Sequence, residues 1–166
     1  ILGIDTSNYT TSLAITDKNG TILTDSRVSL FVKQGERGLR QSQALFQHME
    51  NLPNMVLDLF SRTDRESIGA VAASGQPRPV EGSYMPVFKA GVNYGKVMAA
   101  SLGVPFFEFS HQEGHLEAIL HDSCISNAGE FVTYHLSGGT TEILYANKNT
   151  YRLIGGSRDL AFGQVL

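Results

Sequence analysis

Two stretches of this chain, 130 residues apart, carry the same order of β-prone segments and polar turns. Shifting the sequence by that distance aligns Thr10-Thr11 with Thr140-Thr141 and Lys18-Asn19 with Lys148-Asn149. Each stretch predicts three short strands joined by tight turns, and Asn19-Gly20 is typical of a hairpin turn. The two stretches are either unrelated hairpins or the openings of two copies of one duplicated fold.

Between these stretches, apolar residues switch repeatedly between helical and strand spacing. They recur at helical spacing from Gln41 to Arg62, where Pro53 predicts a kink or a break into two helices. Strand and helix then alternate, which predicts an α/β fold. The expected elements are a strand at residues 68–74, a helix at 88–102, a strand at 105–110 and a helix at 111–121.

A duplicated fold would divide the chain into unequal parts. We expect a first lobe at residues 1–128 and only the beginning of a second lobe at residues 129–166. The chain starts at Ile1 inside a β-prone run and stops at Leu166 inside an opening helix whose apolar residues still need burial. It is therefore expected to be a fragment of a longer protein.

Composition narrows the classes of function. The chain has 13 Lys and Arg against 16 Asp and Glu, a formal net charge of -3, so it lacks the basic excess of a free-standing nucleic-acid binder. Any RNA contact must be local or shared with a partner.

The single cysteine, Cys124, excludes an internal disulfide framework and fits a cytoplasmic protein. No apolar run reaches the roughly 20 residues that span a bilayer, so no membrane association is expected.

Two polar turns are candidates for phosphate binding. Asp5 to Thr11 and Ser137 to Thr141 occupy equivalent places in the two stretches. Glycines allow a sharp turn that presents backbone N–H groups, and hydroxyl groups add further donors. Two such turns facing each other could hold a nucleotide, whereas each alone could be an ordinary tight turn. The chain contains neither GxxxxGK[ST] nor GxGxxG, so a P-loop or Rossmann site has no support.

The sharpest local motif is His111-Gln112-Glu113-Gly114-His115. Histidines at i and i+4 lie on one helix face, which is the spacing of two ligands to one divalent metal ion. Glu113 lies roughly 200° around the helix from His111, so it cannot serve as the general base of a zinc-peptidase HExxH motif. The alternatives are a surface or capping histidine pair, and Ser110 could be an ordinary N-cap.

Taken together, these motifs and their order resemble the TsaD family, the tRNA threonylcarbamoyladenosine transferases formerly called O-sialoglycoprotein endopeptidases. The resemblance runs along the whole chain, which would cover about half of a full family member. The matching segments are Asp5-Thr6-Ser7, Gly91 to Lys96, His111 to His115, Ser137 to Thr141 and Ile154 to Gln164. The resemblance implies the actin-like, Hsp70-like and sugar-kinase ATPase fold, which is ribonuclease H-like, with two α/β lobes around a nucleotide.

The resemblance also implies a set of site residues. His111 and His115 would bind one divalent metal ion, iron or zinc, together with an Asp that lies beyond Leu166. ATP or an acyl-adenylate, with or without Mg²⁺, would be the second ligand. The residues implied in nucleotide or substrate binding are Asp5, Ser7, His135, Leu136, Ser137, Gly138, Gly139, Asp159 and Gly163. No catalytic residue is assigned.

Several positions depart from the family pattern. Tyr9 and Thr10 stand where the family opening ETSCDDT has two carboxylates, and Thr140 replaces the histidine of SGGHT. A divergent paralogue therefore fits better than the standard enzyme.

The expected function is carbamoyl transfer from a threonylcarbamoyl-adenylate-like donor to an amine such as a tRNA adenosine. The alternatives are a non-catalytic nucleotide-binding scaffold and a glycoprotease-type metallopeptidase. Expected partners are a nucleotide, tRNA through a shared complex, and family-type protein partners or a second copy of the chain.

Overall fold

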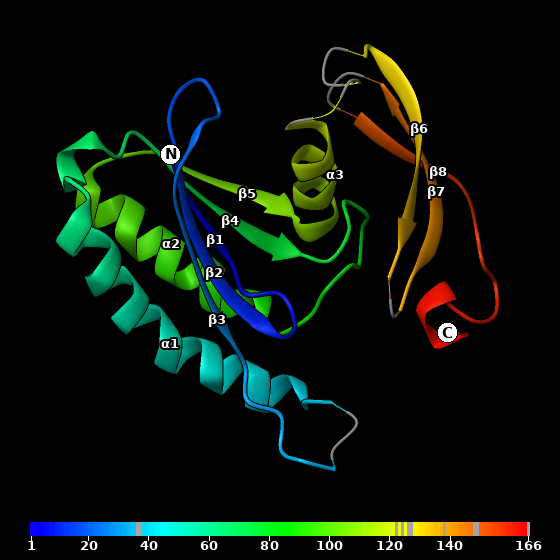
Figure 1. Cartoon of the computed structure of the whole chain (residues 1–166), viewed down its shortest axis with the longest axis horizontal. Coiled ribbons are helices and arrows are strands. Elements are labelled where there is room, and N and C mark those ends of the chain that lie inside the picture. Colours follow the sequence, from blue (N-terminus) through cyan, green and yellow to red (C-terminus); the bar gives the residue numbers. More distant parts are fainter. Residues whose placement is uncertain are drawn as a thin grey trace. The chain divides into compact units, whose positions relative to one another are not determined.

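The chain folds into two units, Ile1–Glu117 and Ala118–Leu166, which divide within one helix (Figure 1). The computed structural model describes residues 1–35, 38–121, 123, 125, 128–137, 139–147 and 150–165. Among the helices in these ranges, none is long and apolar enough to cross a membrane. The division into lobes at residue 128 stays a prediction.

A five-stranded mixed sheet forms the centre of the first unit, in the order β3-β2-β1-β4-β5. The strands are β1 (Leu2–Asp5), β2 (Thr10–Thr16), β3 (Ile22–Ser29), β4 (Val71–Gln76) and β5 (Phe106–Ser110). The first three form an antiparallel meander, whereas β4 is parallel to both β1 and β5. The carboxyl ends of β1, β4 and β5 therefore meet at one edge of the sheet.

Helices α1 (Gln41–Arg62) and α2 (Phe88–Leu102) cover one face of this sheet, as Figure 1 shows. Alternate strand residues point toward them and form the core, which includes Leu2, Ile4, Leu13, Ile15, Val71 and Ala73. Helix α3 (His111–His121) begins directly after β5. A short 3-10 helix, η1 (Arg65–Ser67), joins α1 to β4. The strands and helices expected in this part of the sequence are confirmed.

Helix α1 continues through Pro53 instead of breaking. Proline has no N–H to donate to the carbonyl four residues earlier, so the Met49 carbonyl loses its helical partner. The Tyr94 hydroxyl of α2 lies 3.4 Å from this oxygen and donates a weak hydrogen bond to it. A contact from the neighbouring helix thus compensates for the missing bond, which explains why the helix does not end at this position.

The second unit contains a three-stranded antiparallel sheet, in the order β6-β7-β8. Its strands are β6 (Glu130–Leu136), β7 (Thr141–Asn147) and β8 (Thr150–Gly156), and a 3-10 helix, η2 (Phe162–Gln164), follows. The three strands expected after residue 129 are confirmed. Leu144 and Ala146 of the central strand are buried, whereas Val132, Tyr134 and Leu153 are each more than half exposed. This unit therefore has a much smaller core than the first.

Candidate functional site

The end of β1 and the turn that follows it are tied to α2 and α3 through different side chains. Asp5 accepts from the His111 ring at the start of α3. The Thr6 hydroxyl donates to the Val87 carbonyl just before α2 and accepts from the Gly91 N–H. These contacts fix the end of β1 firmly, because each uses a short side chain with few rotamers.

The start of β2, directly after this turn, is bound to α1. Thr11 and His48 are fully buried, and the Thr11 hydroxyl lies 2.9 Å from Nδ1 of His48. The Asn51 amide, one helical turn further along, donates to the same hydroxyl at 3.0 Å. Burial lowers the pKa of His48, and it does so more strongly than the Asn8 backbone and the Asp5 charge raise it. His48 is therefore a neutral structural residue at pH 7.

Asp5 receives hydrogen bonds from three separate segments of the chain. Its Oδ1 accepts from the Ser7 N–H at 2.8 Å, and its Oδ2 accepts from the Ser74 hydroxyl at 2.5 Å and lies 2.9 Å from Nδ1 of His111. Burial raises the pKa of Asp5, but these hydrogen bonds and the charge of His111 outweigh burial and hold that pKa well below its usual range. Asp5 is accordingly an anion at neutral pH.

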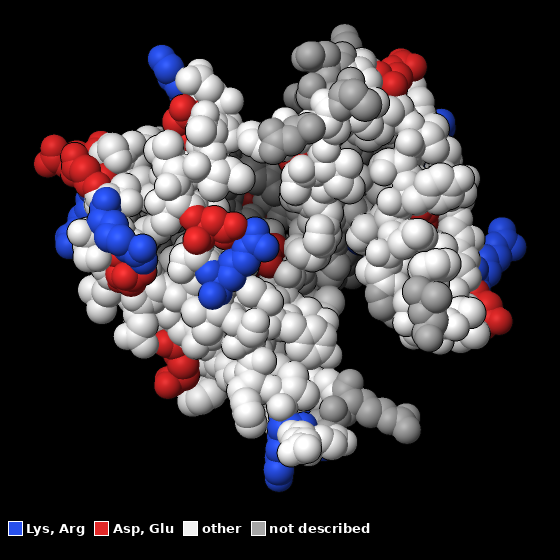
Figure 2. Space-filling model, viewed as in Figure 1, with Lys and Arg blue, Asp and Glu red and all other residues white. Residues whose placement is uncertain are grey.

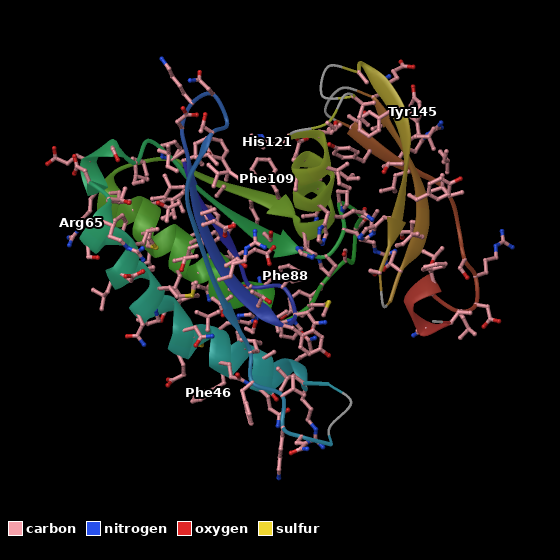
Figure 3. The ribbon with its side chains drawn as sticks, in the orientation of Figure 1. Phe46, Arg65, Phe88, Phe109, His121 and Tyr145 are labelled. Atoms are coloured by element: carbon pink, nitrogen blue, oxygen red, sulfur yellow. The ribbon has the colours of Figure 1, made fainter. Side chains whose placement is uncertain are left out.

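His111 and His115 converge on one face of α3, as their spacing predicted. Their Nε2 atoms lie 2.8 Å apart and their ring centroids 4.2 Å apart in an edge-to-face arrangement. The Phe88 ring at the start of α2 (Figure 3) packs against His111 at a centroid distance of 6.1 Å. The two histidine nitrogens thus face each other next to an apolar wall.

This pair fits two ligands of one metal ion. At the tetrahedral angle, zinc–nitrogen bonds of about 2.0–2.1 Å place two ligand nitrogens about 3.3–3.4 Å apart, so the observed 2.8 Å would widen by about 0.5 Å around an ion. His111 also has the carboxylate partner that metal-bound histidines commonly use. Within the described part of the chain, no group of three or more His, Cys, Asp or Glu side chains could hold an ion. The pair alone is therefore an incomplete site.

Glu113, the acidic residue of the same motif, stabilises the start of α3. Its carboxylate accepts from the Ser110 N–H at 2.7 Å and from the Ser110 hydroxyl at 2.6 Å, while that hydroxyl accepts from the Glu113 N–H at 3.2 Å. This reciprocal arrangement is a capping box. It confirms Ser110 as an N-cap and gives Glu113 a structural role, so the geometry does not support the base of a metallopeptidase.

A polar pocket of about 490 Å³ lies beside this capping box, at the carboxyl ends of β4 and β5. Its lining includes the carboxylates of Glu81, Glu108 and Glu113. The Lys96 Nζ atom lies 3.8 Å from Oε2 of Glu108. The residues that line the pocket are Gln76, Pro79, Val80, Glu81, Gly82, Glu108, Phe109, Ser110 and Glu113. Figure 2 shows that Lys and Arg lie among Asp and Glu on the visible face of the first unit.

The second group of expected site residues lies at the β6–β7 turn of the second unit. The Ser137 N–H donates to the Thr140 carbonyl at 2.8 Å, and the Gly139 N–H lies 3.4 Å from the Ser137 hydroxyl. The chain returns to this turn after β8, because the Gly163 N–H donates to the Ser137 carbonyl at 3.3 Å. Ser137, Gly139 and Gly163 are thus brought together, while Gly138 lies outside the described residues.

The remaining expected residues of this unit differ in exposure. The side chains of His135 and Glu142, on paired strands, are 17% and 9% exposed, with 3.9 Å between Nδ1 and Oε2. Leu136 and Asp159 are exposed. His135 is therefore mainly a residue of the sheet, whereas Asp159 can meet solvent.

Several residues of the first unit were not expected from the sequence. Ser74 reaches Asp5 because parallel pairing places Ile4 beside Ala73, and the next residue of each strand therefore lies at the same edge. The roles of Thr6 and Thr11 depend on how the helices pack against the sheet. No spacing in the sequence signals these contacts.

The chain is similar to known proteins over its full length. A family model described as tRNA N6-adenosine threonylcarbamoyltransferase (TsaD) matches residues 23–166. A tRNA N6-adenosine threonylcarbamoyltransferase of Archaeoglobus fulgidus is 26% identical over 165 residues, which are 99% of this chain and 48% of the relative. The chain thus spans about half the length of the curated relatives that it matches first.

Solved structures show the same fold. YeaZ from Pseudomonas aeruginosa matches with a TM-score of 0.57 at 16% identity, over 96% of this chain and 66% of that one. The inorganic polyphosphate/ATP-glucomannokinase of Arthrobacter sp. strain KM matches with a TM-score of 0.53 at 16% identity, over 95% of this chain and 61% of that one. These neighbours confirm the expected actin-like ATPase fold, and the match to residues 23–166 places this chain in the TsaD family.

Proposed function

We propose that this chain contributes metal and nucleotide ligands to an enzyme that transfers a threonylcarbamoyl group from an adenylate donor to an amine of a tRNA adenosine. Membership in the TsaD family supports the reaction class. The observation that carries the proposal is the 2.8 Å approach of the His111 and His115 nitrogens, next to the carboxylate of Asp5 at the end of β1.

His111 and His115 would hold an iron or zinc ion through their Nε2 atoms. A further ligand would have to come from outside the described residues, consistent with the carboxylate that the family resemblance implies. Such an ion, when bound, would supply Lewis-acid polarisation and a template for orienting the donor. Asp5 and Glu113 would support this pair, one through the His111 ring and the other through the start of α3.

The nucleotide part of the donor would bind at the β6–β7 turn. Backbone N–H groups of a short glycine-containing turn suit phosphate and acyl oxygens, and the Ser137 hydroxyl adds a donor. Gly163, which is hydrogen-bonded to this turn, would line the same place. His135, Leu136, Gly138 and Asp159 complete the proposed set in this unit. Asp5 and Ser7 of the first unit are proposed separately as nucleotide-binding residues. In the transfer, the adenosine amine would attack the carbamoyl carbon, AMP would leave with its phosphate oxygen, and the proton of the amine would pass to an acceptor that is not assigned.

The net negative charge favours tRNA binding by a complex of this chain with a partner. The chain carries a net charge of -3, so phosphate contacts to a whole tRNA would need basic surface from a partner. We infer a cytoplasmic protein that works with other family-type proteins or with a second copy of itself.

A specific observation supports one alternative, a nucleotide-binding scaffold without transferase activity. The exposed Tyr9 stands at a position where the family has a carboxylate. If that carboxylate takes part in the reaction, the chain would bind a nucleotide but not transfer the acyl group.

The complete natural gene product distinguishes the two functions. It is incubated with threonylcarbamoyl-adenylate and unmodified tRNA, and the tRNA nucleosides are analysed by mass spectrometry. We expect modified adenosine with the wild type and with His121→Ala, but not with His111→Ala or His115→Ala. Nucleotide binding without modified adenosine would support the scaffold instead.

A further inference from the structure

We propose that Asp5 is a positioning residue that fixes the ring tautomer and orientation of His111, and so prepares the His111–His115 pair for a metal ion. This role rests on the proposed metal pair of the preceding section. It differs from the nucleotide contact that the family resemblance implies for Asp5.

The hydrogen-bond geometry selects one tautomer of His111. A carboxylate can only accept hydrogen bonds, so the 2.9 Å contact between Asp5 Oδ2 and Nδ1 places the proton of the neutral ring on Nδ1. Nε2 of His111 then carries a lone pair. This lone pair is on the ring nitrogen that lies 2.8 Å from Nε2 of His115, where a shared ion would bind.

Asp5 is itself held in place from two other segments. The Ser7 N–H and the Ser74 hydroxyl donate to its two oxygens, at 2.8 Å and 2.5 Å. Asp5 is the last residue of β1, and β1 is hydrogen-bonded to a neighbouring strand on each side. Asp5 can therefore transmit the rigidity of the sheet to a histidine on the first turn of α3.

Carboxylate partners of metal-bound histidines orient the ring and raise its basicity, and their removal typically lowers metal affinity by about 10- to 100-fold. We expect an effect of this size here. Asp5→Ala removes the acceptor altogether. Asp5→Asn keeps the size of the side chain but removes its charge, so its effect should be smaller.

The tautomer is tested without any metal. Long-range ¹H–¹⁵N correlation spectra of histidine-labelled protein, recorded at about pH 8, above the ordinary histidine pKa, distinguish Nδ1–H from Nε2–H. We expect Nδ1–H for His111 in the wild type and in Ser74→Ala, which keeps the Asp5 acceptor. Asp5→Ala should give a mixture that contains Nε2–H. An Nε2–H ring in the wild type, or an unchanged tautomer in Asp5→Ala, would overturn the role of Asp5.

Metal affinity is measured by titrating the same proteins with Co²⁺ alone. Asp25→Ala is the matched control, because Asp25 is on the edge strand β3 and pairs with Arg27. We expect weaker binding for Asp5→Ala by about 10- to 100-fold and unchanged binding for Asp25→Ala. Equal affinity of Asp5→Ala and the wild type, with binding lost in His111→Ala, would refute the role of Asp5 but keep the metal pair. Co²⁺ binding that survives His111→Ala would instead refute the metal pair.

Discussion

Asp5 and His111 are 106 residues apart in the sequence, yet Oδ2 of the carboxylate and Nδ1 of the ring are 2.9 Å apart. The contact exists because β1 pairs with β4 and β4 pairs with β5, which brings the end of β1 next to the start of α3. The His111–His115 pair and the end of β1 are thus parts of one connected structure.

The capping box at the start of α3 gives the first prediction. Ser110→Ala removes the two hydrogen bonds of the Ser110 hydroxyl, and Glu113→Ala removes the two that its carboxylate accepts. Each should lower the free energy of unfolding by about 1 kcal/mol. Because both substitutions remove the bond between the hydroxyl and the carboxylate, the loss in the double variant should be smaller than the sum of the two single losses. Urea unfolding of the four proteins measures this coupling. Strict additivity would show that the two side chains act independently.

Close packing of α2 gives the second prediction. A Cβ on Gly91 would lie 3.0 Å from the Thr6 hydroxyl and 3.3 Å from an Ile4 methyl group. Gly91→Ala should therefore destabilise the protein by about 1–3 kcal/mol, although alanine favours helices.

Gly114 offers a matched control, because it is also helical and a Cβ there meets nothing within 4 Å. Gly114→Ala should stabilise the protein by up to about 1 kcal/mol. Thermal unfolding compares the two variants, and equal shifts in the same direction would contradict the packing described here.

Burial of His48 gives a prediction for pH dependence. The pKa of His48 is lowered in the folded state from its ordinary value of 6.5, so below that pH the unfolded chain binds more protons than the folded one. Stability should accordingly fall as the pH drops from about 7.5 to about 5.5. His48→Asn removes this titration while keeping a polar group near Thr11. An identical pH dependence of urea unfolding in wild type and variant would exclude His48 as its source.

Structural features that form between residues close in sequence were predictable. The hairpin turn before β3 is held by contacts within five residues. Gly20 has a φ of 87°, and the Asp17 carboxylate accepts from the N–H groups of Asn19 and Thr21. The helical spacing of His111 and His115 is local too, which is why their convergence was predicted. Such features depend on neighbours within a few residues.

Features that depend on packing between distant elements were not predictable. Pro53 was expected to kink α1 or to break it into two helices. The helix does not break, and a hydroxyl from α2 compensates for the missing hydrogen bond. The Asp5–His111 contact requires the order of the strands in the sheet, and no periodicity in the sequence contains that order. The nucleotide contact that the family resemblance implies for Asp5 stays a prediction.

The β6–β7 turn gives a prediction for nucleotide binding. Gly139 does not have a left-handed φ, and a Cβ there would meet nothing within 4 Å, so Gly139→Val should leave the fold intact. If its N–H approaches a phosphate, the variant should nevertheless bind ATP more weakly by calorimetry. Gly129→Val, in the same unit and equally open, is the control. Equal ATP affinity in the two variants would leave Gly139 as part of a structural turn.

The metal content of the purified protein tests the central claim most directly. Elemental analysis of the complete gene product, prepared without chelators, should find about one iron or zinc ion per chain in the wild type and in His121→Ala. His111→Ala and His115→Ala should contain none, because each removes one of the two nitrogens that lie 2.8 Å apart. A full complement of metal in both of these variants would contradict the assignment of His111 and His115 as ligands.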